Sequence, residues 1–160
     1  MEKHMLKMRD GRLLEVHTAG DPTAPAIVFH HGTPSSVLTW KDWLPNVAAR
    51  GLFAISSSRA GYGNSDRRAG RSFGDNVSDT ADVLDYFGVK DFVSIGWSGG
   101  GPHALADTQD SRNRGAISLA GIAPFGDPAL DFLAGMGEEN EIEFGAAFSR
   151  VLPSRQDAWF

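Results

Sequence analysis

The sequence of 160 residues predicts an α/β fold in which helices flank a mostly parallel sheet. Four short apolar runs, bounded by Gly or Pro, have the length and composition of strands. They span residues 26–31, 52–58, 92–97 and 115–121. Segments with helical periodicity separate these runs, and strands that alternate with helices pair in parallel through right-handed crossovers. Because each run is continuously apolar, we expect the strands to be buried on both faces.

A β-hairpin is predicted before the first of these strands. Residues 5–18 contain two short runs on either side of Asp10-Gly11, a dipeptide typical of tight turns. Pro22 and Pro25 then mark a loop. We expect the first buried strand to follow this loop.

The first predicted helix runs from Trp40 to Ala48, where apolar residues recur at helical spacing and Gly51 supplies a stop. Pro45 either kinks this segment or opens a second short helix at its first turn, because its missing N–H is harmless only there. We expect Trp40 and Trp43 to be core residues.

The second predicted helix lies between the second and third buried strands. Ser72 and Asp75 form a capping box at its start, and Gly88 ends it. The residues expected to share its buried face are Phe73, Val77, Thr80, Ala81, Leu84 and Phe87.

Composition and charge exclude several function classes. The net charge of −5 comes from 20 acidic and 15 basic residues that are interspersed, so no basic stripe is available to bind a nucleic acid. There is no cysteine for a thiolate metal site, and the acidic run from Glu138 to Glu143 has no accompanying histidine, so we expect no metal. The N-terminus lacks the apolar length of a secretory signal or membrane span, which predicts a cytoplasmic protein without membrane contact.

A serine stands between glycines directly after the run at 92–97. In Gly96-Trp97-Ser98-Gly99-Gly100, a strand turns into a helix at Ser98, as a nucleophile elbow requires. Gly96 and Gly100 give the strand and the helix room to approach each other. The N–H of Gly99 then lies at a helix N-terminus, where it is suited to hold an oxygen that becomes negative during attack. The stretch fits neither a P-loop nor G-x-G-x-x-G, so no cofactor is expected.

A second donor is predicted in the loop after the first buried strand. There His31-Gly32-Thr33-Pro34 places the amide of Thr33 where it can face the same point as the amide of Gly99.

Three motifs in register resemble the α/β-hydrolase superfamily over about residues 5–125. They are His31 to Pro34, Arg59 to Ser65 (RAGYGNS) and Gly96 to Ala106 (GWSGGGPHALA). The resemblance implies an esterase-like serine hydrolase of small-molecule ester-like substrates, with Ser98 as nucleophile and the amides of Thr33 and Gly99 as oxyanion hole. Esters, amides, lactones and thioesters all remain open as substrates. A serine at the elbow argues against the haloalkane dehalogenase and epoxide hydrolase branches, which use an aspartate there.

The family's acid and histidine follow later strands than this sequence contains. His103 is the only histidine after Ser98, and it lies on the helix that leads away from the elbow. We therefore expect residues 1–124 to be the N-terminal part of a hydrolase core, truncated before the last strands, and residues 125–160 to begin a cap or lid. The triad's acid and histidine are expected to be missing from this chain.

Two further departures from the family concern local packing. Relatives usually carry an aspartate and a proline where this chain has Ser58 and Ala60. The eight residues from 107 to 114, DTQDSRNR, are polar on a helix that is expected to be wedged against the sheet.

A non-catalytic function remains open beside the hydrolase. In this alternative the chain is a fold remnant that acts as a binding or oligomerising protein. An incomplete sheet would expose an edge and apolar faces that favour self-association.

Overall fold

The structure of the protein, a computed structural model, describes residues 1–151. Its internal contacts divide the chain into two units, residues 1–122 and 123–160. Within the described residues, the first unit holds every strand. Residues 152–160, the end of the predicted cap segment 125–160, lie outside the described part. That this segment begins a cap stays a prediction.

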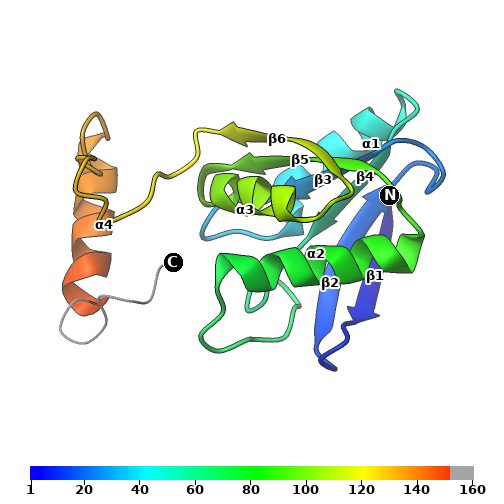
Figure 1. Cartoon of the computed structure of the whole chain (residues 1–160), viewed down its shortest axis with the longest axis horizontal. Coiled ribbons are helices and arrows are strands. Elements are labelled where there is room, and N and C mark those ends of the chain that lie inside the picture. The colour runs from blue at the N-terminus through cyan, green and yellow to red at the C-terminus, as the bar shows by residue number, and fades with distance from the viewer. Residues whose placement is uncertain (152–160) are drawn as a thin grey trace. The chain divides into compact units, whose positions relative to one another are not determined.

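The described residues form one sheet of six strands in the order β1-β2-β4-β3-β5-β6 (Figure 1). β1 pairs with β2 and β2 with β4 in antiparallel orientation, whereas β4, β3, β5 and β6 run parallel. The bounds are β1 Glu2–Lys7, β2 Leu13–Ala19, β3 Ala26–His30, β4 Phe53–Ser57, β5 Phe92–Trp97 and β6 Asn113–Leu119. The α/β class, the hairpin and the mostly parallel sheet are thus confirmed.

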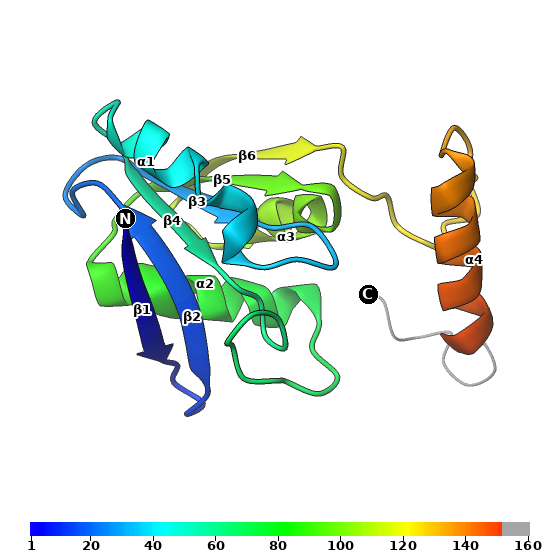
Figure 2. The ribbon, with the colours of Figure 1, turned by 180° about the vertical axis from the view of Figure 1, so that it is seen from behind.

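Helices cover both faces of the sheet, as Figures 1 and 2 show from opposite sides. The 3₁₀ helix η1 (Val37–Trp40) and α1 (Trp43–Ala48) lie on one face. On the other face lie α2 (Phe73–Phe87) and α3 (Gly101–Ala106). The strands alternate accordingly: Val28 of β3 packs in the cluster beneath α2, and its neighbour Phe29 in the cluster with η1 and α1.

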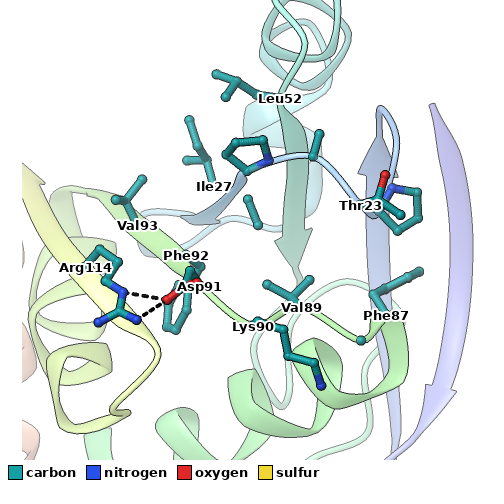
Figure 3. Close-up of a pocket in the computed structure, with 15 residues that line it drawn as sticks. Thr23, Ile27, Leu52, Phe87, Val89, Lys90, Asp91, Phe92, Val93 and Arg114 are labelled. Atoms are coloured by element: carbon teal, nitrogen blue, oxygen red, sulfur yellow. Dashed lines mark hydrogen bonds and ion pairs between the residues drawn. The ribbon is translucent and has the colours of Figure 1, made fainter.

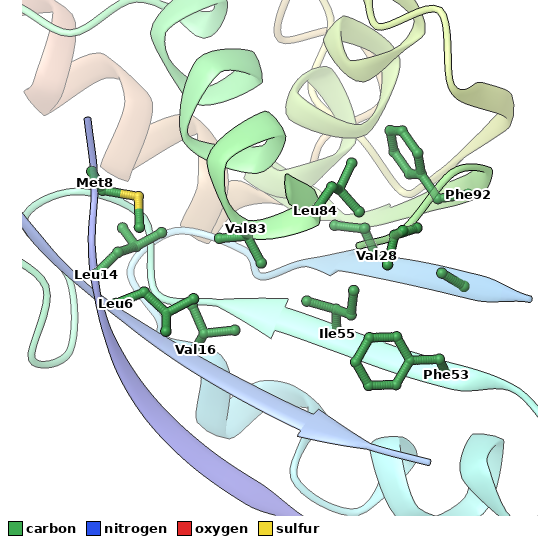
Figure 4. Packing of buried hydrophobic residues seen from close by; sticks show 12 residues of the cluster. Leu6, Met8, Leu14, Val16, Val28, Phe53, Ile55, Val83, Leu84 and Phe92 are labelled. Atoms are coloured by element: carbon green, nitrogen blue, oxygen red, sulfur yellow. The ribbon is translucent and has the colours of Figure 1, made fainter. Parts of the chain in front are cut away.

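In the larger apolar cluster, the N-terminal hairpin packs against α2 (Figure 4). Leu6 of β1 and Leu14 and Val16 of β2 pack with Val83 and Leu84 of α2. Strands β3, β4 and β5 add Ala26, Val28, Phe53, Ile55 and Phe92 to it. The hairpin is therefore part of the core.

The first predicted helix forms as two short pieces. η1 ends at Trp40, and α1 begins at Trp43 with Pro45 in its first turn, which matches the second of the two alternatives given for this proline. Trp40 is buried, but Trp43 is 58% exposed. The core assignment of Trp43 is wrong, because the break between η1 and α1 turns its ring outward against the edge of Trp40.

The capping box of Ser72 and Asp75 and the left-handed C-cap at Gly88 form as predicted around α2. The buried face of α2 differs from the prediction. Asn76, Thr80, Val83 and Leu84 are among its buried residues, whereas Val77 and Ala81 are only partly buried. Polar side chains share this face because it also meets the charged residues of the hairpin, for example where Arg12 pairs with Asp79.

The expectation of burial on both faces is wrong for the last strand. β3 and β4 are almost wholly buried, but Ile117 and Leu119 of β6 are 51% and 44% exposed. Within the described residues β6 pairs only with β5, which leaves one edge unpaired. An edge strand of this kind keeps only part of the burial that a central strand has.

The polar run 107–114 was expected on a helix, and this expectation is wrong. α3 ends at Ala106, a 3₁₀ turn η3 spans Asp107–Gln109, and β6 begins at Asn113. The chain therefore leaves the helix where its apolar residues end, and most of these polar side chains lie in a turn.

The second unit contains α4 (Glu138–Val151). Four phenylalanine rings contact one another beside this helix, and the closest pair, Phe125 and Phe148, stack at 3.6 Å between centroids. Asp127, in the segment before α4, accepts a hydrogen bond from the N–H of Ala129. No helix in the described part of the chain is long and apolar enough to cross a membrane.

Candidate active site

Ser98 lies at the junction where β5 ends and a 3₁₀ turn, η2 (Ser98–Gly100), leads into α3. Its φ of 53° is in the left-handed region, which non-glycine residues rarely adopt. Strained conformations of this kind persist only where the surrounding structure holds them in place. The structure confirms the strand-to-helix turn that the sequence predicts at this serine.

The glycines on either side of Ser98 are required by close backbone contacts. A Cβ on Gly96 would lie 2.0 Å from the carbonyl oxygen of Gly100. A Cβ on Gly100 would lie 2.3 Å from the carbonyl oxygen of His30. Any larger residue at either position would therefore separate α3 from β5 or from β3.

The loop after β3 lies directly against this elbow. β3 and β5 are neighbours in the sheet, and His30 stands opposite Gly96 in register. A Cβ on Gly32 would be 3.4 Å from the Cβ of Ser98, and one on Gly99 would be 3.3 Å from the amide nitrogen of Thr33. Ser98, Thr33 and Gly99 are thus brought together, while their roles as nucleophile and oxyanion donors stay predictions.

The Ser98 side chain has no hydrogen-bond partner within the described residues. All five histidines lie in the described part, and none of them bonds to this serine: His4, His17, His30, His31 and His103. His103 is buried, and its ring packs 4.6 Å from that of Phe73. Burial lowers the pKa of His103, so its ring is neutral at pH 7.

A buried histidine–carboxylate pair lies behind the elbow. His30 Nε2 is 2.6 Å from Asp107 Oδ2, and both side chains are shielded from solvent. The pair joins the end of β3 to the turn after α3. It resembles the histidine–acid part of a catalytic triad, but neither member hydrogen-bonds to Ser98. Sequence reasoning missed it because 77 positions separate the partners and no spacing rule connects them.

The side chain of Arg59 holds the loop that contains Thr33. Arg59 is 1% exposed, and its guanidinium donates hydrogen bonds to the carbonyl oxygens of His31 and Gly32 and to Thr33 Oγ1. Its backbone N–H donates to His31 Nε2 over 3.0 Å. Burial lowers the pKa of Arg59 to about 10, which leaves it cationic at neutral pH. Sequence reasoning placed Arg59 in a motif but gave it no role.

Burial, and then the charge of Arg59, lower the pKa of His31 to about 3. Its ring is therefore neutral, with Nε2 as acceptor and Nδ1 as donor. Nδ1 donates to the carbonyl of Gly32 over 2.6 Å.

A carboxylate from another strand is present beside Ser58. The hydroxyl of Ser58 donates to Glu15 Oε2 over 2.7 Å and accepts from the N–H of Val37. The same Glu15 oxygen accepts the backbone N–H of Asn64. Glu15 of β2 therefore supplies, next to position 58, the negative charge that an aspartate would have carried.

A cavity of about 640 Å³ lies at the opposite end of the parallel strands (Figure 3). It is lined by residues at the starts of β3 and β5, such as Ile27 and Phe92, and by Phe87 and Val89 at the end of α2. Ser98 follows the carboxyl end of β5, where open α/β sheets bind their ligands. This cavity is separate from the candidate site. The described residues contain no cluster of side chains suited to a metal ion.

Comparisons with known proteins agree with the fold. A family model for the alpha/beta hydrolase fold matches residues 25–137, well over half of the chain. The chain is similar to an epoxide hydrolase from Caballeronia sordidicola, with 30% identity over 94 residues that cover 57% of this chain and 29% of that protein. It is also similar to a bifunctional esterase/perhydrolase from Acinetobacter calcoaceticus, with 34% identity over 83 residues, 51% of this chain and 30% of that protein.

The fold is also found among solved structures. An esterase from Exiguobacterium antarcticum aligns with a TM-score of 0.73 at 20% identity, covering 93% of this chain and 56% of that one. At this identity the likeness concerns the fold alone. The chain spans about a third of the length of the curated relatives it matches.

Proposed function

The chain belongs to the α/β hydrolase fold family, and from that premise we propose that it carries the nucleophile and the oxyanion hole of a serine hydrolase that cleaves small-molecule esters. The observation that carries the proposal is the left-handed backbone of Ser98 at the end of β5. This conformation costs free energy and lifts the hydroxyl away from the main chain. Ser98 is half-buried, and its hydroxyl, which has no hydrogen-bond partner among the described residues, is then available to a substrate.

In the proposed reaction Ser98 Oγ attacks the carbonyl carbon of the ester while its proton passes to a general base. The carbonyl oxygen becomes negative and is held by the N–H groups of Thr33 and Gly99. The intermediate collapses with loss of the alcohol, which takes a proton from the protonated base. Water then attacks the acyl-serine, and the acid is released.

The residue at position 98 favours ester over epoxide chemistry. Several relatives are named epoxide hydrolases, and one is named an esterase/perhydrolase. The epoxide hydrolase branch is marked by an aspartate at the elbow. This chain has Ser98 there, which favours acyl transfer.

We infer that the general base is not among the five histidines of this chain, since none of them hydrogen-bonds to Ser98. We propose that the histidine and the acid come from outside these 160 residues, from a continuation of the chain or from a second chain. Without them the chain alone would acylate slowly, because the oxyanion hole and binding give only residual catalysis.

The lack of a histidine bonded to Ser98 favours a second candidate, a non-catalytic protein that keeps the fold. Its function would be binding or self-association, for which the unpaired edge and exposed apolar residues of β6 provide a surface. The length of the gene's reading frame distinguishes the hydrolase from the non-catalytic protein. If the reading frame continues beyond residue 160 for roughly 100 codons and encodes a histidine near its end, the hydrolase is favoured. An immediate stop codon favours the non-catalytic protein.

Covalent labelling tests the nucleophile directly. An activated fluorophosphonate, in excess at alkaline pH, is expected to attach one probe molecule to Ser98. Intact-mass spectrometry detects the added mass, and peptide mapping locates it. The Ser98→Ala variant is expected to remain unlabelled. Ser118→Ala, an exposed serine at the end of neighbouring β6, is the matched control and is expected to label like the wild type. Equal labelling of wild type and Ser98→Ala would exclude Ser98.

A further inference from the structure

Arg59 is a buried cation without an anionic partner in the described residues. Its side chain is 1% exposed, and it forms no ion pair with any described carboxylate. Its polar contacts are backbone carbonyls, one hydroxyl and the face of Tyr62, whose ring centroid is 5.4 Å from the guanidinium carbon. Burying an unneutralised charge costs several kcal/mol, so packing alone does not account for it.

One contact of Arg59 is to the peptide that joins Gly32 and Thr33. Arg59 Nη2 donates to the carbonyl of Gly32 over 3.0 Å, and His31 Nδ1 donates to the same oxygen over 2.6 Å. The Gly32–Thr33 peptide is trans, so its N–H points away from its C=O. Because the carbonyl end is fixed by two donors, the direction of the Thr33 N–H at the other end is fixed as well.

That N–H is one of the two donors in the proposed oxyanion hole. The amide nitrogen of Thr33 lies beside Gly99, 3.3 Å from where a Cβ on that glycine would stand. A third bond, from Arg59 Nη2 to Thr33 Oγ1 over 2.9 Å, holds the side chain of the same residue. The guanidinium therefore holds both the carbonyl of the peptide before Thr33 and the side chain of Thr33.

The charge of Arg59 also affects the Thr33 N–H. A cation bonded to a peptide carbonyl polarises the peptide and strengthens its N–H as a donor. No described carboxylate neutralises this field, so it favours negative charge beside Thr33, where the carbonyl oxygen of a substrate becomes an anion.

We propose that Arg59 is the positioning residue of the oxyanion hole, holding the Gly32 carbonyl so that the Thr33 N–H points at the developing oxyanion and polarising that peptide with its charge. This inference rests on the proposed serine hydrolase function. Arg59 does not touch the substrate, so its effect passes through Thr33.

The first test compares Arg59→Met with Arg71→Met in the 160-residue protein. Arg71 is a matched control because it also lies over the ring of Tyr62, at 5.8 Å, and carries the same charge without bonding to the Thr33 loop. The measurement is the second-order rate constant for fluorophosphonate labelling of Ser98. We expect Arg59→Met to lower it about 10- to 100-fold, less than or equal to the loss of a whole oxyanion donor. Arg71→Met is expected to stay within about twofold of wild type.

Urea unfolding of each variant separates positioning from folding. If Arg59→Met is folded and labels at the wild-type rate, or if both variants slow labelling equally, the inference is overturned. If Arg59→Met does not fold, Arg59→Lys decides. Lysine keeps the charge but not the planar fork that binds several acceptors at once. A folded Arg59→Lys that labels several-fold more slowly supports the inference, and an unchanged rate overturns it.

A second readout does not depend on the chemistry of Ser98. In the ¹H–¹⁵N spectrum, loss of the polarising contact is expected to shift the Thr33 amide proton upfield in Arg59→Met and not in Arg71→Met. If wild-type protein is not labelled, the proposed function fails by itself, and this amide shift still decides whether Arg59 sets the Thr33 N–H. An unchanged Thr33 resonance in Arg59→Met would overturn that role.

Discussion

Buried neutral histidines are expected to make the free energy of unfolding fall as the pH is lowered from 7.5 to 5. Burial lowers the pKa of His31 to about 3 and lowers that of His103 still further. Burial also lowers the pKa of His17, although the carboxylate of Glu15 opposes this effect. His31 and His103 are not protonated in the folded protein across this pH range, and they set the size of the effect.

The sign follows from comparing the two states. In the unfolded chain His31 and His103 each take up a proton as the pH falls below the ordinary pKa of 6.5, whereas in the folded protein they do not. The free energy of unfolding is therefore unaffected by these two histidines above pH 6.5 and falls progressively below it. For His31 at pH 5, 1.5 pH units below 6.5, the loss is about 2 kcal/mol. His103 adds a similar amount, and about 4 kcal/mol is a large part of the stability of a domain.

Carboxylates contribute in a separate, lower pH window. Hydrogen bonds from Arg12 and Arg112 lower the pKa values of Asp10 and Asp110, so the stability that these groups contribute is lost only as the pH falls below about 4. A decline between pH 6.5 and 5 therefore belongs to the histidines.

Urea titrations followed by tryptophan fluorescence at pH 7.5, 6.5, 5.5 and 5.0 measure this decline. His103→Leu provides the decisive comparison, because His103 Nδ1 has no hydrogen-bond partner among the described residues. An apolar replacement therefore leaves no partner group with an unsatisfied hydrogen bond. Between pH 6 and 5 the variant is expected to lose about 1.4 kcal/mol less per pH unit than the wild type. Equal stability of the wild type at pH 7.5 and 5.0, or identical slopes for both proteins, would refute the reasoning.

Three further outcomes are expected. Gly100→Ala should strongly lower the urea concentration at the unfolding midpoint and slow the labelling of Ser98, since the new Cβ would meet a carbonyl oxygen at 2.3 Å. Gly115→Ala, where a Cβ meets open space, should change neither quantity. Asp107→Ala should destabilise the protein by about 3 kcal/mol by leaving His30 unpaired, and a His30→Leu/Asp107→Leu double variant should recover most of that loss in the same titration; a double variant as unstable as the single one would contradict this. Sedimentation velocity should detect self-association of the wild type that Leu119→Lys weakens, and a wild type that stays monomeric at high concentration would argue against an interface at β6.

Local features of this fold could be predicted because they depend on neighbouring residues. The capping box at Ser72, the left-handed C-cap at Gly88 and the turn at Ser98 each follow from side chains within a few positions. The strands followed from apolar runs, and their parallel order followed from the helices between them. In each case backbone geometry leaves few alternatives.

The rest of the candidate site depends on contacts between distant segments. The grip of Arg59 on the Thr33 loop spans 26 positions, and the contact between Ser58 and Glu15 spans 43. No periodicity connects such partners. The exposure of Trp43 and of β6 was also hidden, because an apolar residue has the same appearance in the sequence whether or not another element covers it.

Two features that lower stability meet at the same point of the structure. The left-handed backbone of Ser98 costs roughly 1–2 kcal/mol, and the unneutralised charge of Arg59 adds a desolvation cost behind the neighbouring loop. Arg12, another shielded cation of this chain, is by contrast paired with Asp79. A fold that required only a core would place neither cost there, whereas a site prepared for negative charge beside a serine requires both. This coincidence favours a reactive Ser98 over a remnant that merely keeps the fold.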